Sequence, residues 1–233
     1  MMKQGEHLDA EDSLREKIRQ LEDLFKDLRH FDWRLRIVDD ASKNNAGEYA
    51  GQIFREEYPQ YCREGRVTVE NVEKKEGPKG GAIIQGMHKA ALRGSDIVVF
   101  TDSDNSAPLY CIGDILWAIL MENYDAAIGS RALSDSIVLN RGLLRLIQSW
   151  QDTILFNWFA IRPLMPEIKE IKDTQNGFKG FRRELLLDIL PKMQIRGAIF
   201  DVELIYLSKI FAQGKGVKEF GMPWIATAGV SNF

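Results

Sequence analysis

The stretch that decides the fold is Asp96-Ile97-Val98-Val99-Phe100-Thr101-Asp102-Ser103-Asp104-Asn105. Its apolar, β-branched run is typical of a buried strand. The two aspartates that follow it fall where open α/β sheets bind ligands, beyond the carboxyl end of a strand. Because alternate residues of an extended segment point the same way, Asp102 and Asp104 can converge on one ion. Hard oxygen ligands suit Mg²⁺ or Mn²⁺. The alternative is a polar turn in which an aspartate caps the next helix.

Two neighbouring segments also predict strands with polar groups at their ends. Arg34 to Val38 is followed by Asp39 and Asp40, and residues 125–129 are followed by Ser130-Arg131. For the first pair the alternative is an N-cap, in which Ser42 or Asp40 binds the free amides of the following helix. The arginine is placed to bind a phosphate, although a lone arginine is more often a surface residue. Three such strand ends, with carboxylates for a metal and cations for phosphates, predict a site for a nucleoside-diphosphate compound.

A glycine-rich turn, Glu76-Gly77-Pro78-Lys79-Gly80-Gly81-Ala82, opens a predicted helix that runs to about Arg93. Free amides and the positive end of the helix dipole favour phosphate at such a turn, and Lys79 adds a point charge beside Gly80. The turn lacks the Lys-Ser/Thr pair of a P-loop and is not a dinucleotide fingerprint. A turn that uses glycine only for its backbone angles is the alternative.

Composition predicts one α/β domain over residues 1–233. The chain is 45% hydrophobic and 28% charged, which is enough for a large core, and no Pro/Gly/Ser-rich linker divides it. A net charge of −3 excludes general attraction to nucleic acid. Cys62 and Cys111 are too few for a disulfide framework and indicate reduced thiols in a cytoplasmic protein. Met1 to Asp12 is polar, so no signal peptide is expected, and no run reaches the roughly 18 apolar residues of a membrane span.

Residues 137–165 combine Trp, Phe and Leu on a wide helical face with the flanking arginines Arg141, Arg145 and Arg162. A helix of this kind can lie in a membrane interface, so we expect a peripheral contact at the cytoplasmic face of a membrane. A core helix or a dimer-packing helix is the alternative.

The carboxyl-terminal third carries further polar groups. Lys172 to Phe181 is a polar loop that enters a strand with alternating aromatics. A helix is predicted to begin at Phe200. The first turn of that helix holds Asp201 and Glu203. Acids are favoured at helix amino ends on electrostatic grounds alone, so capping is a serious alternative to a functional role.

Taken together, these segments resemble the inverting family 2 glycosyltransferases, and within them the dolichyl-phosphate glucosyltransferase and bacterial polyprenyl-phosphate glycosyltransferase branch. Each segment is weak evidence alone, but all occur in the family's order. The matching segments are Val38-Asp39-Asp40-Ala41-Ser42, Lys79-Gly80-Gly81-Ala82, Thr101-Asp102-Ser103-Asp104, Gly129-Ser130-Arg131, Asp173-Thr174-Gln175-Asn176-Gly177-Phe178-Lys179, Phe200-Asp201-Val202-Glu203-Leu204 and Met222-Pro223-Trp224.

The resemblance implies a GT-A fold, an α/β architecture with a mostly parallel central sheet flanked by helices. It also implies a nucleoside-diphosphate sugar donor, of the UDP-glucose or GDP-mannose type. Asp39 and Asp40 would lie near the base and ribose. Asp102 would face the nucleotide-sugar and, with Asp104, hold Mg²⁺ or Mn²⁺. The phosphates would be met by the turn of Lys79 and Gly80.

On the acceptor side, the resemblance implies that Arg131 and Lys179 meet the phosphate of a polyprenyl phosphate. Asp173, Asp201 and Glu203 would be catalytic residues together with Arg131, as a base or its supporting carboxylates. A hydroxyl acceptor needs a general base, whereas a lipid phosphate is already anionic at neutral pH.

The family normally begins with an apolar strand, and Met1 to Ala10 contains none, so we expect a sheet without its usual first strand. The predicted function is metal-dependent transfer of a sugar, glucose first, to a polyprenyl phosphate. The alternatives are transfer to a sugar or protein hydroxyl and a non-catalytic nucleotide-sugar-binding or scaffold domain.

Overall fold

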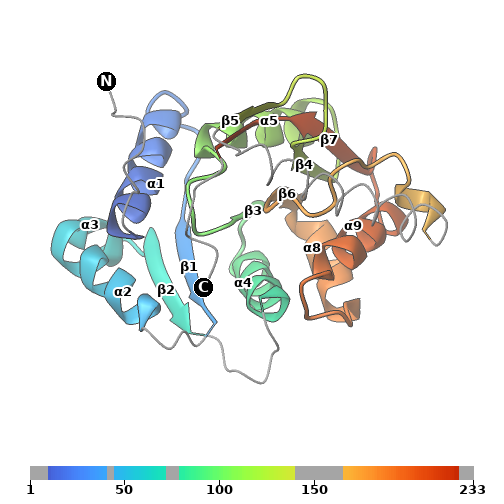
Figure 1. Cartoon of the computed structure of the whole chain (residues 1–233). Helices are drawn as coiled ribbons and strands as arrows, with labels where there is room; N and C mark the ends of the chain where they lie inside the picture. Colours follow the sequence, from blue (N-terminus) through green and yellow to red (C-terminus); the bar gives the residue numbers. More distant parts are fainter. Residues whose placement is uncertain (1–9, 41–44, 72–78, 140–164, 226–233) are drawn as a thin grey trace.

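The computed structural model describes residues 10–40, 45–71, 79–139 and 165–225 (Figure 1). The helices are α1 (Ala10–Phe25), α2 (Ala46–Glu57), α3 (Pro59–Arg63), α4 (Gly80–Leu92), α5 (Ile112–Leu116), α8 (Arg183–Ile189) and α9 (Phe200–Ile210). Shorter helical turns are η2 (Leu109–Cys111), η3 (Trp117–Met121), η5 (Pro166–Ile168) and η6 (Leu190–Lys192). The strands are β1 (Leu35–Asp39), β2 (Val67–Asn71), β3 (Ile97–Thr101), β4 (Ala126–Ser130), β5 (Ile137–Leu139), β6 (Phe178–Arg182), β7 (Val217–Gly221) and β8 (Pro223–Ile225).

The central sheet has the strand order β3-β6-β4-β7. Strand β6 runs antiparallel to both β3 and β4, while β4 and β7 are parallel. The predicted mostly parallel arrangement therefore holds for three of the five strand pairs of the described residues, and the sheet is mixed at β6. The antiparallel strand has a direct consequence: β6 begins at the edge where β3 and β4 end.

A second, parallel pair joins β1 to β2, in register from Leu35 opposite Val67 to Asp39 opposite Asn71. Among the described residues no strand pairs with both β1 and β3, so the two sheets are not joined by backbone pairing there. Helix α4 packs against β1 as well as β3. Its Gly86 lies on β1, since a Cβ there would stand 2.7 Å from Val38 Cγ2.

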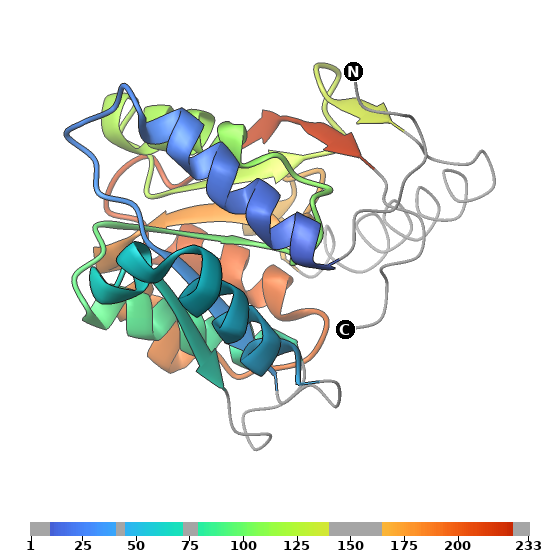
Figure 2. The ribbon, with the colours of Figure 1, turned by 90° about the vertical axis from the view of Figure 1, so that its left-hand side faces the viewer.

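Strand alternation divides the hydrophobic core between the two faces of the central sheet. Val98, Phe100, Ile128 and Phe181 turn to the face covered by α4, α8 and α9. Ala127 and Phe178 turn to the other face, where α1 and α5 pack. Figures 1 and 2 show these helices on opposite sides of the sheet.

Residues 137–139 form strand β5, which pairs in parallel with β8 from Ile137 opposite Pro223. The helical interpretation of residues 137–165 is therefore wrong for the first three residues, and β-branched Ile and Val at these positions suit a strand. Residues 140–164, with the three arginines expected to flank a membrane-contacting helix, lie outside the described residues. Within the described residues, no helix has the length and apolar character that crossing a membrane requires.

We predict that Gly86→Ala destabilises the protein by about 1–3 kcal/mol, because the new methyl group would overlap the stiff side chain of Val38. Denaturant unfolding monitored by circular dichroism measures the change. Gly113→Ala is the matched control: nothing lies within 4 Å of a Cβ at Gly113, and removing a helical glycine is neutral or adds up to about 1 kcal/mol. Equal stability of the two variants would contradict the packing of α4 on β1.

Candidate active site

The candidate site lies at the edge of the central sheet where β3 and β4 end and β6 begins. Asp102 follows β3, and its backbone N–H donates to the carbonyl of Gly177 at 3.1 Å. Arg131 follows β4, and the segment from Asp173 to Gly177 leads into β6. The sheet order thus brings together two strand ends and one strand start that are distant in the sequence.

The Asp102 carboxylate lies between a lysine and a glycine. Lys79 Nζ donates to Asp102 Oδ1 at 2.6 Å, and the lysine side chain is 59% exposed. On the other side, a Cβ at Gly177 would stand 2.0 Å from Asp102 Oδ2. Residue 177 must therefore lack a side chain for Asp102 to occupy this position.

The Asp104 carboxylate is bonded within its own turn, as expected if this segment is a polar turn. Its carboxylate accepts hydrogen bonds from the backbone N–H of Ser106 at 3.1 Å and from Ser106 Oγ at 2.9 Å. Its backbone carbonyl accepts a bond of 2.9 Å from Nζ of Lys17 on α1. Burial lowers the pKa of Lys17 to about 8, against the opposing charges of Asp104 and Asp102.

The sequence interpretation did not select Lys17. The signal that could have found it is a lysine beside the apolar positions Leu14, Ile18 and Leu21 of α1, where a solvated charge is not expected. In the structure Lys17 is 4% exposed, so it places a cation under the acidic loop.

Arg131 and Asp173 form a two-pronged ion pair. Arg131 Nε donates to Asp173 Oδ2 at 2.7 Å and Nη2 donates to Oδ1 at 2.8 Å, while the Arg131 backbone N–H also donates to Oδ2. The guanidinium stacks 5.0 Å from the ring centre of Trp224. Burial alone would raise the pKa of Asp173, but its bonds to Arg131 hold that pKa below the usual range.

Lys179 and Asp201 form a second pair, which is buried. Lys179 has no exposed surface, and its Nζ donates to Asp201 Oδ1 at 2.5 Å and to the carbonyl of Asn176. The same ammonium lies 5.1 Å from the ring centre of Phe100. Burial raises the pKa of Asp201, and Lys179 opposes that rise only in part.

Electrostatic coupling joins these groups into one cluster. Burial lowers the pKa of Arg131, but Asp173 outweighs that effect, and the charges of Asp102 and Asp201 add to the rise. Asp201 in turn senses Lys79 and Asp102. Of the residues predicted from the sequence, the structure thus brings together Lys79, Asp102, Arg131, Asp173, Lys179 and Asp201.

Asp39 and Asp40 lie at the end of β1, in the other sheet. Asp39 Oδ2 accepts a bond of 3.2 Å from the N–H of Gly47 in the first turn of α2, whereas the capping alternative named Ser42 or Asp40. Burial, and then the charge of Asp39, raises the pKa of Asp40. Their predicted role at the base and ribose stays a prediction.

The amino end of α4 is covered by the loop that precedes α9. A Cβ at Gly80 would stand 2.7 Å from the carbonyl oxygen of Arg196, and the N–H of Gly81 donates to that same oxygen at 3.1 Å. One helix amide expected to be open to phosphate is therefore bonded within the protein. Glu203, in the first turn of α9, is bonded to this loop, because its carboxylate accepts the N–H groups of Gln194 and Ile195.

The carboxylates of Asp102 and Asp104 are suitable ligands for a divalent metal. No cluster of three or more His, Cys, Asp or Glu side chains occurs in the part of the chain that the structure describes. Mg²⁺ needs no such cluster, because proteins commonly hold it with one or two carboxylates while phosphates and water supply the remaining oxygens. Asp102 and Asp104 offer carboxylates of this kind on one loop.

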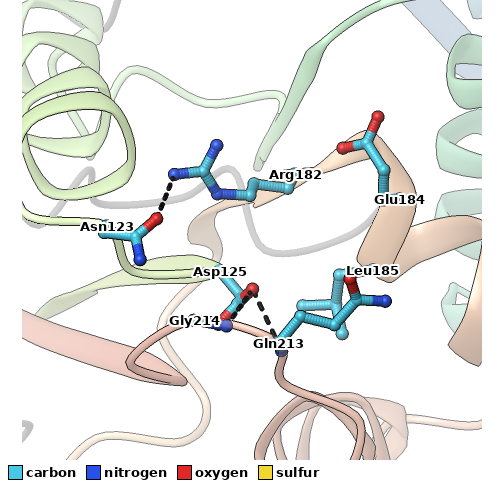
Figure 3. A pocket seen from close by; sticks show the side chains of 7 residues that line it. All are labelled: Asn123, Asp125, Arg182, Glu184, Leu185, Gln213 and Gly214. Carbon is cyan, nitrogen blue, oxygen red and sulfur yellow. Dashed lines mark hydrogen bonds between the residues drawn. The ribbon is translucent and has the colours of Figure 1, made fainter.

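A pocket of about 220 Å³ lies at the opposite end of β4 and is a separate feature (Figure 3). Asp125, just before β4, accepts hydrogen bonds there from the backbone N–H groups of Gln213 and Gly214. Arg182 donates to Asn123 Oδ1 across the pocket. These contacts hold loops together, so the pocket's polar groups are used structurally.

We predict that Lys179→Met destabilises the protein by about 3–5 kcal/mol at pH 7, because it leaves the buried carboxylate of Asp201 without its partner. The folded-state pKa of Asp201 is raised. The loss is therefore smallest below the unfolded pKa of about 4 and grows as the pH rises through the folded-state pKa. Denaturant unfolding at pH 4 and pH 7 measures it.

The double variant Lys179→Met/Asp201→Asn is the control, since it removes the uncompensated charge and should recover most of the loss at pH 7. A pH-independent loss in Lys179→Met would contradict the buried pair.

Comparison with known proteins identifies the family of this chain. A family model described as "Glycosyl transferase family 2" matches residues 8–190. The dolichyl-phosphate β-glucosyltransferase of Saccharomyces cerevisiae is 31% identical over 189 residues, covering 76% of this chain and 52% of the relative. The dolichol-phosphate mannosyltransferase of Pyrococcus furiosus is 30% identical over 170 residues, covering 71% and 43%. The chain thus spans about half the length of these relatives.

Solved structures share the fold. Glucosyl-3-phosphoglycerate synthase from Mycobacterium tuberculosis superposes with a TM-score of 0.53 at 20% identity, over 89% of this chain and 66% of that one. S. aureus TarS superposes with a TM-score of 0.54 at 16% identity, over 94% and 57%. The architecture is the predicted GT-A fold, and the chain belongs to glycosyl transferase family 2.

Proposed function

We propose that this protein transfers a sugar from a nucleoside-diphosphate sugar to a polyprenyl phosphate. One observation carries the proposal: Asp102 lies at a strand end, bonded to Lys79 and within the field of Arg131. The two substrates bring a diphosphate and a second phosphate to this edge of the sheet. The two cations near Asp102 are suited to bind them. A cation beside each phosphate offsets its charge.

On the donor side, Asp102 and Asp104 would hold the divalent metal, and Lys79 would meet the diphosphate beside Gly80. A bound metal stabilises the negative charge that develops on the departing diphosphate. Lys79 is suited to the same task, because its exposed ammonium can reach a phosphate from its position on Asp102. Asp39 and Asp40 would contact the base and ribose.

On the acceptor side, Arg131 is the cation best placed to meet the phosphate. Its Nε and Nη2 are bonded to Asp173, while Nη1 makes no hydrogen bond with any residue in the described ranges. A phosphate oxygen of the acceptor would attack the anomeric carbon as the bond from that carbon to the diphosphate oxygen breaks. The nucleoside diphosphate leaves with the electron pair. No proton has to be removed from an ionised phosphate, so no base is assigned.

Lys179, Asp201 and Glu203 receive supporting parts in this proposal. Lys179 is fully buried on Asp201, so we propose that this pair contributes its field and holds the segment that leads into β6. Glu203 is bonded to the backbone of residues 194 and 195, so we propose that it holds the loop over the amino end of α4.

The relatives support the choice of substrates. Those compared above are named as dolichyl-phosphate glucosyl- and dolichol-phosphate mannosyltransferases. The solved M. tuberculosis synthase holds Mn²⁺ and UDP, and UDP-glucose in a second complex. We therefore propose UDP-glucose as the first donor to test, GDP-mannose as the second, and Mn²⁺ or Mg²⁺ as the metal. We also propose peripheral contact with the cytoplasmic face of a membrane through residues 137–165. Ile137 and Leu139, at the start of that range, are 58% and 50% exposed.

We predict that the protein forms a lipid-linked sugar when it is incubated with UDP-[³H]glucose, Mn²⁺ and a polyprenyl phosphate in detergent. Asp104→Asn should lower the rate by about 100-fold or more, because a metal is worth several kcal/mol of transition-state stabilisation. Radioactivity extracted into organic solvent measures the product, with GDP-[³H]mannose, Mg²⁺ and EDTA as parallel conditions.

Asp135→Asn, at an exposed position outside the cluster, is the control for Asp104→Asn. Transfer only to soluble sugars or protein hydroxyls would contradict the lipid acceptor, and an undiminished rate in Asp104→Asn or in EDTA would contradict the metal assignment.

A non-catalytic nucleotide-sugar-binding domain is the second candidate, favoured by the lack of pairing between β1, which carries Asp39, and β3. Both candidates bind the donor, so we predict a metal-linked rise in the melting temperature with the correct donor, since ligand at 100 times its dissociation constant stabilises by about 2.7 kcal/mol. Differential scanning fluorimetry with UDP- and GDP-sugars, each with and without Mn²⁺, measures it. A donor shift without any transfer would favour the non-catalytic domain.

A further inference from the structure

Glu219 on β7 bonds to the backbone of the loop that carries Asp173. Its Oε1 accepts the N–H of Asp173 at 2.8 Å, and both of its oxygens lie 3.1 Å from the N–H of Lys172. The hydroxyl of Ser130, at the end of β4, lies near enough to lower the pKa of its carboxyl. One side chain thus joins β7, the end of β4 and the loop that leads into β6.

Glu219 was not among the site residues predicted from the sequence. It stands opposite Ile128 in the pairing of β4 with β7, two residues after Val217, on the face that packs against α9. A glutamate at this alternation position is a charge on a buried face, which is costly without partners. Burial raises the pKa of Glu219, and the N–H groups of Lys172 and Asp173 and the Ser130 hydroxyl oppose that rise.

The bonds of Glu219 continue directly to Arg131. Glu219 fixes the backbone at Asp173, and the Asp173 carboxylate then holds the Nε and Nη2 edge of Arg131. Trp224 supports one face of the same guanidinium. The two acids lie close together, and the charge of Asp173 adds to the rise in the pKa of Glu219. Each acid has its own compensating partner, since Asp173 faces a cation and Glu219 faces backbone N–H groups.

We propose that Glu219 is a positioning residue: by fixing the backbone of Asp173 it sets the direction in which Arg131 presents its remaining N–H edge to the acceptor phosphate. The part that concerns the acceptor rests on the proposed function. The part that concerns Arg131 is a statement about the free protein and is tested separately. A glutamine at position 219 keeps one oxygen acceptor for the N–H of Asp173, whereas an alanine keeps none.

The first experiment observes Arg131 without any substrate. An Arg Nε–H that is held in a hydrogen bond exchanges slowly with water, so Arg131 should give a ¹⁵Nε–H NMR signal that disappears in Arg131→Lys. We expect this signal to weaken in Glu219→Gln and to be lost in Glu219→Ala. Glu122→Gln is the matched control, since Glu122 pairs with Lys218 on the other face of β7, and should leave the signal unchanged.

The second experiment measures steady-state kinetics of transfer from UDP-glucose to polyprenyl phosphate. Glu219→Gln should raise the KM for the polyprenyl phosphate about tenfold, the effect expected when hydrogen bonds to a charged group are weakened. The KM for the donor should stay within about twofold, because Lys79 and Asp102 have no bond to Glu219. In an Arg131→Lys background, Glu219→Gln should raise the KM for polyprenyl phosphate much less, since its effect passes through Arg131.

The outcomes separate the two proposals. An unchanged Arg131 signal in both Glu219 variants overturns the positioning role, and so does an equal rise in the KM of donor and acceptor, which a general loss of structure would cause. Loss of the signal in a protein that transfers to no polyprenyl phosphate upholds the positioning role and overturns the proposed acceptor. If Glu219→Ala does not fold, Glu219→Gln alone decides.

Discussion

The antiparallel insertion of β6 between β3 and β4 is the constraint on which the candidate site depends. The register places Lys179 opposite Phe100 on one side and Ile128 on the other. Because side chains alternate along a strand, a slip of one residue would turn Lys179 to the wrong face and separate it from Asp201. The same register makes the loop that precedes β6 start beside Asp102 and Arg131. Three polar segments therefore meet because of backbone pairing rather than because of their own charges.

This pairing forces charges into the interior, and the structure tolerates them only because each has partners. The pair of Lys179 and Asp201 is removed from water almost completely, and Asp173 is 1% exposed. Ion pairs of this kind seldom stabilise a protein, because desolvation offsets the attraction. What they provide is fixed charge in a region of low dielectric, where fields are strong and do not need to reorganise when a substrate's charge shifts. The buried ion pairs thus add little to stability, but they fix the charges at this edge of the central sheet.

The strand ends could be predicted from the sequence, since an apolar run that stops at Asp102 and another that stops at Arg131 are local patterns. The α4 turn and the helix that begins at Phe200 are equally local. Pairing is not local: nothing in Phe178 to Arg182 states that this strand runs antiparallel between two others. The strand Ile137–Leu139 was missed for the same reason, because its partner is Pro223–Ile225, more than eighty residues away in the chain. Glu219 was missed because its partners are backbone N–H groups, which leave no pattern in a sequence.

The cations of the site differ in burial, and this difference separates their roles in a way that the sequence does not show. Lys79 has a side chain that is 59% exposed, while that of Lys179 is 0% exposed and bonded to Asp201 and a carbonyl. A phosphate that binds Lys79 displaces water and shares the ammonium with Asp102, whereas a phosphate that binds Lys179 would first have to break a buried ion pair. The desolvated Asp201 would then stand alone, at a cost of several kcal/mol that phosphate binding would have to recover. We therefore propose that Lys79 and the outer edge of Arg131 contact phosphate directly, and that Lys179 acts on the site through its charge and through Asp201.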